Sequence, residues 1–198
     1  PAAVLADDTV SASPEQINVT VSFQNSWFMM APQTMRVSAD TAESYGFTLD
    51  EQSEHVTALD VLVAANKAYA DANPELFDGF NKATAVTDEK TKATTYSNDL
   101  LAVQTSSHGA YITQLFGNAT SNCGFTVNGV TPHDNVGKDV EGYEGPQYTG
   151  YAVNQAIVQN NDNVEFFIYQ DTDFYFDYSA FFTDEDDNRL TTVTAAPN

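Results

Sequence analysis

Residues 56–74 read VTALDVLVAANKAYADANP, and this stretch decides the fold. Thr57 and Asp60 have the spacing of a capping box, in which a hydroxyl and a carboxylate close the first turn of a helix. Apolar residues then recur at helical spacing, at Leu59, Leu62, Val63, Ala65 and Tyr69. Asn73-Pro74 ends the pattern. The stretch predicts a helix over residues 57–72 whose apolar stripe lies on one face of a sheet.

The residues before this helix favour strands. Ile17, Val19, Val21 and Phe23 alternate with polar residues, which is the period of a half-buried strand. The apolar run Trp27–Met30 is expected to be part of the core, and residues 35–37 are expected to form a short second strand. Residues 38–46 predict a short helix that stops at Gly46.

Further strand patterns follow the helix. They cover residues 111–116, 125–127, 151–153 and 164–169, and Asn128-Gly129 is a strong signal for a tight turn. Residues 74–107 are harder to assign and are interpreted as an insertion with one or two short helices. No internal repeat and no second core is evident. The sequence therefore predicts one α+β domain over residues 15–195, preceded by a segment, residues 1–14, that is a linker or the remnant of a signal peptide.

The composition is strongly acidic. Lys and Arg number 7 against 28 Asp and Glu, which gives a formal net charge of −21 in 198 residues. This charge repels phosphates, so nucleic acid and anionic membrane are disfavoured partners. No stretch of 18 apolar residues is present, so no membrane insertion is expected. A single cysteine, Cys123, excludes an internal disulfide.

The first residues point to export. Pro1–Ala6 reads PAAVLA and is followed by Asp7 and Asp8, which is typical of the small-residue end of a signal peptide. The acidic charge also fits a salty or calcium-rich exterior. We therefore expect an extracellular or cell-surface location.

Several motifs, taken together, resemble a known family. They are VTALDVL at 56–62, YITQLFG at 111–117, GFTVNG at 124–129 and NDNVEFFIY at 161–169. Their order resembles a family of secreted β-grasp modules that includes the transcobalamin C-terminal domain. Pro132-His133-Asp134 after the Asn-Gly turn is similar to long versions in surface proteins of gut Gram-positive bacteria. The resemblance implies a β-grasp-like mixed sheet with one main helix packed on it, a small helical insertion at about 74–107, and an exterior location. Phe125 stands where the family often has Trp, and Asn161 replaces the usual Gly of a turn.

Loop residues after the Asn-Gly turn are candidates for ligand binding. Aromatic side chains on Gly-rich loops are a common binding surface, and the related transcobalamin domain closes over a corrinoid. A pocket framed by this loop region would bind a corrinoid-like molecule or a sugar. The candidate residues are Asn128, His133, Asp134, Tyr143, Tyr148 and Tyr151.

An acidic segment near the C-terminus is a candidate calcium site. Asp171 and Asp173 point the same way if the segment is a strand, and further carboxylates follow. Calcium takes six to eight oxygen ligands, although a solvated acidic turn explains the same pattern. The candidate ligands are Asp171, Asp173, Asp177, Asp184 and Asp186.

No catalytic motif is present. The chain has no G-x-S-x-G elbow, and Cys123 is interpreted as a small core or strand-edge thiol. The leading hypothesis is therefore a non-catalytic secreted or cell-surface module, which acts as an interaction or scaffold unit of a bacterial surface protein and has calcium as its candidate cofactor. A small-ligand binding domain is the alternative, and a hydrolase is the third. The expected partner is a protein, small molecule or glycan outside the cell.

Overall fold

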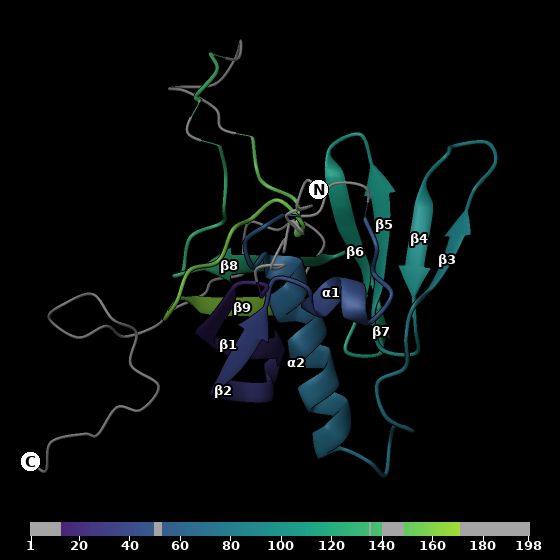
Figure 1. Ribbon diagram of the computed structural model, residues 1–198, viewed down its shortest axis with the longest axis vertical. Helices are drawn as coiled ribbons and strands as arrows, with labels where there is room; N and C mark the ends of the chain where they lie inside the picture. The colour runs from purple at the N-terminus through teal and green to yellow at the C-terminus, as the bar shows by residue number, and fades with distance from the viewer. Residues whose placement is uncertain (1–12, 50–52, 135, 140–148, 171–198) are drawn as a thin grey trace, which may run out of the picture.

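The computed structural model describes residues 13–49, 53–134, 136–139 and 149–170 of the chain. These residues form an α+β structure with two sheets and one main helix (Figure 1). The predicted fold class is therefore confirmed. Most of the predicted N-terminal segment and the part of the predicted domain after residue 170 lie outside the described residues.

A mixed sheet of four strands forms the first layer. Its strand order is β2-β1-β9-β8. The central strands β1 and β9 are parallel, and both outer pairs are antiparallel. The main helix follows the first hairpin of this sheet, β1–β2, in the chain. The strands are β1 (Gln16–Asn25), β2 (Trp27–Ser38), β8 (Cys123–Val127) and β9 (Asn163–Ile168).

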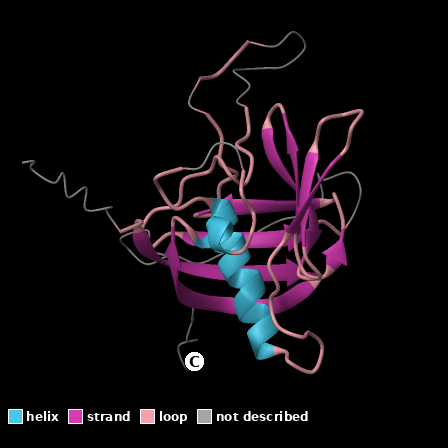
Figure 2. Cartoon of the chain, turned by 45° about the vertical axis from the view of Figure 1, so that its right-hand side comes forward, coloured by secondary structure: helices cyan, strands magenta, loops and turns pink. Residues whose placement is uncertain are grey.

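Helix α2 (Ala58–Ala72) lies across one face of this sheet (Figure 2). Its start is the predicted capping box, because the Thr57 backbone N–H and hydroxyl both donate to Asp60 Oδ2, at 2.9 and 2.8 Å. Its apolar stripe is buried together with the alternating residues of β1, from Ile17 to Phe23. The short helix α1 (Thr41–Ser44) is also present, and Gly46 adopts a φ of +84° directly after it.

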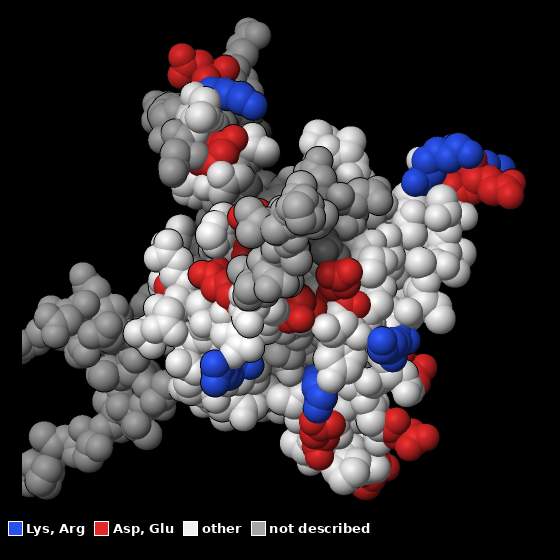
Figure 3. Space-filling model, in the orientation of Figure 1, with Lys and Arg blue, Asp and Glu red and all other residues white. Residues whose placement is uncertain are grey.

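A second sheet of five strands stands beside the first (Figure 1). Its strands follow chain order and all pairs are antiparallel. The strands are β3 (Thr84–Thr87), β4 (Thr94–Ser97), β5 (Ala102–Ser106), β6 (Gly109–Leu115) and β7 (Asn118–Ala119). The turn between β3 and β4 holds acidic and basic side chains together at the free end of the hairpin (Figure 3).

The predicted helical insertion at 74–107 is wrong. Phe77 and Phe80 of this region lie in a loop and pack on aromatic rings of other elements. The ring centroid of Phe77 is 5.7 Å from that of Tyr69, and the centroid of Phe80 is 5.3 Å from that of Tyr45. The rest of this region supplies β3, β4 and all of β5, whose Thr residues suit an extended backbone.

The Trp27–Met30 run is only partly in the core, so that prediction was mostly wrong. Trp27 is 69% exposed and Phe28 is 50% exposed, whereas Met30 is buried. The exposure of Trp27 and Phe28 follows from their position in the sheet. The run begins at the hairpin turn, where Ser26 has a φ of +64°, and continues along the edge strand of the sheet.

One aromatic cluster joins the two sheets to the helix. Phe23 of β1 stacks on Phe116, which lies between β6 and β7, with ring centroids 4.1 Å apart. Tyr69 of α2 packs edge-on against Phe116 at 5.2 Å. Asn66 of α2 is fully buried and accepts the Phe116 backbone N–H at 3.0 Å. The first and second sheets therefore share one core. Among the described residues, no helix has the length and apolar character needed to cross a membrane.

Candidate functional site

Asn128 holds a turn in place. Asn128 and Gly129 have φ values of +53° and +76°, as a tight turn of this type requires, and Val127 and Val130 exchange two backbone hydrogen bonds across it. The Asn128 amide donates to Asp162 Oδ1 at 2.8 Å and accepts the Asn163 N–H at 2.9 Å. The sequence predicts this side chain as a ligand contact. In the structure its amide group instead links the turn to the start of β9.

The segment after this turn is tied to residues 149–151. Asp134 and Thr149 are joined twice, since the Asp134 N–H donates to the Thr149 carbonyl at 2.9 Å and Asp134 Oδ1 accepts the Thr149 N–H at 3.1 Å. The Tyr151 N–H donates to the Pro132 carbonyl at 2.9 Å. Asp134 therefore has a structural role, and its bonds bring the backbones of residues 132 and 151 together. Tyr143 and Tyr148, the other two predicted tyrosines, lie outside the described residues.

Residues 152–158 are anchored to the beginning of α2. The Ala156 carbonyl accepts the Ala58 N–H and the Val153 carbonyl accepts the Leu59 N–H, both at 2.8 Å. These are two of the N–H groups that the first turn of a helix leaves without partners. The strand predicted over residues 151–153 is therefore wrong, because this backbone bonds to a helix end.

Gly109 allows the same segment to approach β6 closely. Its φ is +106°, and a Cβ at this position would lie 2.4 Å from the Cβ of Ala152. Beside it, the Ala110 N–H donates to Asn154 Oδ1 at 2.8 Å. The fold thus places residues 150–154 directly against the start of β6.

These contacts leave a hollow between the two sheets, here called the inter-sheet hollow. Its volume is ≈ 540 Å³. Tyr111 and Ile112 of β6 line one side, Cys123 and Phe125 of β8 line another, and residues 150–153 complete it. This volume is within the range of small-molecule sites, which is roughly 300–1,000 Å³.

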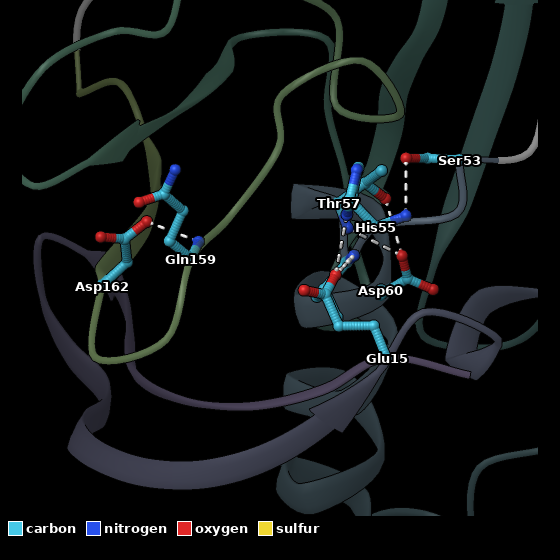
Figure 4. A network of polar contacts seen from close by, with 8 residues as sticks. Glu15, Ser53, His55, Thr57, Asp60, Gln159 and Asp162 are labelled. Atoms are coloured by element: carbon cyan, nitrogen blue, oxygen red, sulfur yellow. Dashed lines mark hydrogen bonds and ion pairs between the residues drawn. The ribbon is translucent and has the colours of Figure 1, made fainter. Parts of the chain in front are cut away.

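A second hollow lies beside the Asn128-Gly129 turn and is called the turn hollow. It has a volume of ≈ 510 Å³ and lies between residues 130–133 and the segment that carries Gln155, Ile157 and Gln159. The Gln159 N–H donates to Asp162 Oδ2 at 2.7 Å, which fixes the far end of this segment (Figure 4). Thr131 and Tyr151 line both hollows. The two hollows together are called the groove.

The lining of the groove is unusual for this chain in two ways. None of its described lining residues is Asp, Glu, Lys or Arg, although the chain has a net charge of −21. It also gathers four large apolar side chains that are exposed to solvent, namely Tyr111, Val130, Tyr151 and Ile157. Exposed apolar side chains that cluster in a concave site indicate a binding surface.

His133 and His108 bring an imidazole to each hollow. His133 lines the turn hollow, and its Nδ1 lies 2.6 Å from the Asp134 carbonyl oxygen. That bond holds the ring against its own backbone. His108 lines the inter-sheet hollow from the β5–β6 turn. Of the six predicted ligand residues, His133 and Tyr151 therefore line the groove, and the sequence prediction missed the contribution of β6.

The polar network beside the start of α2 is structural. Glu15 Oε2 accepts the Val56 N–H at 3.1 Å and lies 3.2 Å from His55 Nδ1 (Figure 4). These contacts attach the residue before β1 to the turn before α2. The five aspartates of the predicted calcium site lie outside the described residues. Within the described ranges, no group of three or more His, Cys, Asp and Glu side chains is arranged to hold a metal.

Cys123 lies in the wall of the inter-sheet hollow at the start of β8. Its side chain is partly buried, and its Sγ lies 3.9 Å from the Ile112 carbonyl oxygen. Burial raises the pKa of this thiol to about 11. Of the two sequence interpretations, a core or a strand-edge thiol, the position at the start of the outer strand β8 fits the second. The thiol is also a unique chemical label inside the groove, because the chain has 1 cysteine.

Alkylation of Cys123 is expected to depend steeply on pH. Only the thiolate reacts, so the rate with iodoacetamide should rise about tenfold per pH unit from pH 8 to pH 10. The rate should level off only near the raised pKa of about 11. The same protein in urea, where the thiol is solvated, is the control. A plateau near pH 9 in the folded protein would show that burial does not shift this pKa.

Comparison of the whole chain with protein-family models and with curated proteins found no match to either.

Proposed function

We propose that this chain is a non-catalytic extracellular binding module that takes an uncharged ligand in the groove. The observation that supports this proposal most strongly is the composition of the residues that line the groove. Its described residues include no Asp, Glu, Lys or Arg in a strongly acidic chain, and four exposed apolar side chains gather there. A charged ligand would find no carboxylate, Lys or Arg partner among those residues, whereas an uncharged ligand with an apolar face would bury the exposed apolar side chains.

The proposal assigns no reaction to the groove. General acid–base catalysis needs a group that titrates within reach of the substrate. The described lining holds no carboxylate, and its two imidazoles, those of His108 and His133, line different hollows. The raised pKa of Cys123 leaves little thiolate at neutral pH. The exterior location rests on the signal-like residues 1–6 and on the resemblance to secreted β-grasp modules.

A second candidate is an interaction unit that docks to another protein through the edge strand β2. The observation that favours it is the pair Trp27 and Phe28, which are 69% and 50% exposed. Neither residue lines the groove. This function and ligand binding use different surfaces, so one module can have both.

Replacing Tyr151 by alanine is expected to abolish ligand binding and leave the fold intact. Tyr151 is 41% exposed and lines both hollows, and its hydrogen bond to Pro132 comes from the backbone, which the substitution keeps. The midpoint of unfolding should change by less than about 2 °C, as is typical of a surface substitution.

The measurement is thermal unfolding followed by circular dichroism, with a panel of an uncharged corrinoid, neutral sugars and acidic sugars. A ligand at about 100 times its dissociation constant adds roughly 2.7 kcal/mol, which raises the midpoint by about 5–10 °C. This shift should occur with the wild type and disappear in Tyr151→Ala. Phe28→Ala is the matched control, since it also removes an exposed aromatic ring. Equal shifts in both variants would place the ligand outside the groove.

A further inference from the structure

We propose that the ligand of the groove is a linear neutral oligosaccharide, with one sugar unit in each hollow and Tyr151 between them. This inference rests on the proposed function and names its ligand class. The two hollows have similar volumes, ≈ 540 and ≈ 510 Å³, and they meet at Thr131 and Tyr151. A ligand made of repeated, similar units fits two similar sites in a row better than one rigid ring system does.

The aromatic side chains provide the apolar part of the recognition. Tyr111 is 51% exposed in the inter-sheet hollow, and Tyr151 is 41% exposed where the hollows meet. Sugar rings have apolar faces made of C–H groups, and these faces stack on aromatic rings. A tyrosine ring offers both an apolar face and a hydroxyl, and its burial by a ligand costs little conformational entropy.

Uncharged hydrogen-bonding groups are spread along both hollows. They are Gln104, Thr113 and Ser121 in the inter-sheet hollow, Thr131 in both, and Gln155 and Gln159 in the turn hollow. A purely apolar ligand would cover these amides and hydroxyls and leave them without water, which is costly for each group. A ligand with hydroxyls on every unit satisfies them.

Gln155 offers a fixed donor in the turn hollow. Its Oε1 accepts the Ala152 N–H at 3.0 Å, which orients the amide. No described residue accepts a hydrogen bond from Gln155 Nε2. Both N–H groups of this amide can therefore donate to a ligand that enters the turn hollow. Sugar hydroxyls accept such bonds. Acidic oligosaccharides are disfavoured, because the net charge of −21 repels them and no described lining residue is Lys or Arg.

Isothermal titration calorimetry of the full chain tests the inference. The probes are glucose-, galactose-, mannose- and N-acetylglucosamine-based oligosaccharides of one to four units, with oligogalacturonates as the acidic set. At least one neutral series should bind, with affinity rising about tenfold or more from one unit to two as the second hollow fills. Tyr111→Ala and Gln155→Ala should each weaken binding of the two-unit ligand about tenfold, whereas Phe28→Ala should not.

Protection of Cys123 separates failure of this inference from failure of the proposed function. A neutral oligosaccharide that occupies the inter-sheet hollow should slow alkylation of Cys123 at pH 9 at least threefold. If only a non-sugar compound such as the corrinoid slows alkylation, the inference of an oligosaccharide ligand is wrong, but the proposal that the groove binds a ligand is supported. If acidic sugars bind as well as neutral ones, or affinity does not depend on chain length, the inference is also overturned. If none of the compounds slows alkylation or shifts unfolding, the proposed function fails as well.

Discussion

Replacing Phe23 by alanine is expected to lower the free energy of unfolding by about 3–5 kcal/mol. Phe23 is fully buried in β1 and stacks on Phe116, whose ring packs in turn against Tyr69 of α2. The substitution leaves a cavity where the first sheet, the second sheet and the helix meet, and none of these elements can close it alone. Because domains are typically stable by only 5–15 kcal/mol, this loss is a large share of the total.

Urea unfolding followed by circular dichroism measures this effect. Phe28→Ala is the matched control, because Phe28 is 50% exposed on the next strand of the same hairpin. It should change the free energy of unfolding by less than about 1 kcal/mol. If both variants lose the same small amount, the aromatic cluster is not what joins the two sheets.

Elements with strong local signals could be predicted from the sequence. The capping box gave the start of α2, and the period-two alternation of Ile17 to Phe23 gave β1. Of the second sheet, the strand predicted over residues 111–116 lies largely in β6, but β3 and β4 were not predicted. All four residues of β3 are exposed, so the strand has no alternation between buried and exposed positions to detect. Phe77 and Phe80 are partly buried by tertiary contacts with Tyr69 and Tyr45, and a local sequence pattern does not reveal such contacts.

Only one wall of the groove could be predicted from the sequence, the wall formed by the residues after the Asn-Gly turn. The Asn128-Gly129 signal predicted the turn before residues 130–133, and the aromatic, Gly-rich loop made Tyr151 a candidate. Tyr111 was assigned to a strand, but which side of β6 would face β8 depends on how the two sheets meet. The close approach at Gly109 that helps to set this arrangement gives no signal in a single sequence beyond the presence of a glycine in a turn. Asn128 and Asp134 have polar side chains of the kind that bind ligands. In this fold both side chains instead form hydrogen bonds that join segments of the chain.

Replacing Asp60 by alanine is expected to lower the free energy of unfolding by about 3 kcal/mol at pH 7. The carboxylate is buried and accepts three hydrogen bonds, from the Ala42 N–H at 2.9 Å and from the N–H and hydroxyl of Thr57 at 2.9 and 2.8 Å. Its loss removes the capping box and detaches α1 from α2. A cavity of ≈ 30 Å³ beside Asp60 is large enough to admit a water molecule, which offsets part of the loss.

Asp71→Ala is the control for this substitution. Asp71 is on the same helix, but it is exposed and paired with Lys67 at the surface, at 2.5 Å, so its loss should cost less than about 1 kcal/mol. Chemical unfolding of both variants at pH 7 measures the difference. Equal stabilities would show that Asp60 contributes no more than a surface carboxylate.

The effect of Asp60→Ala should also depend on pH, in the direction opposite to that of a surface ion pair. Burial raises the pKa of Asp60 above its usual 3.8, against the opposing effect of the hydrogen bonds from Ala42 and Thr57. The folded state therefore holds this proton more tightly than the unfolded chain does. The stability contributed by Asp60 is fully present below pH 3.8 and declines as pH rises through the folded-state pKa. The difference in stability between wild type and variant should thus be larger at pH 3.5 than at pH 7, and a difference that shrinks on acidification would mean that the ionised carboxylate is the form the fold favours.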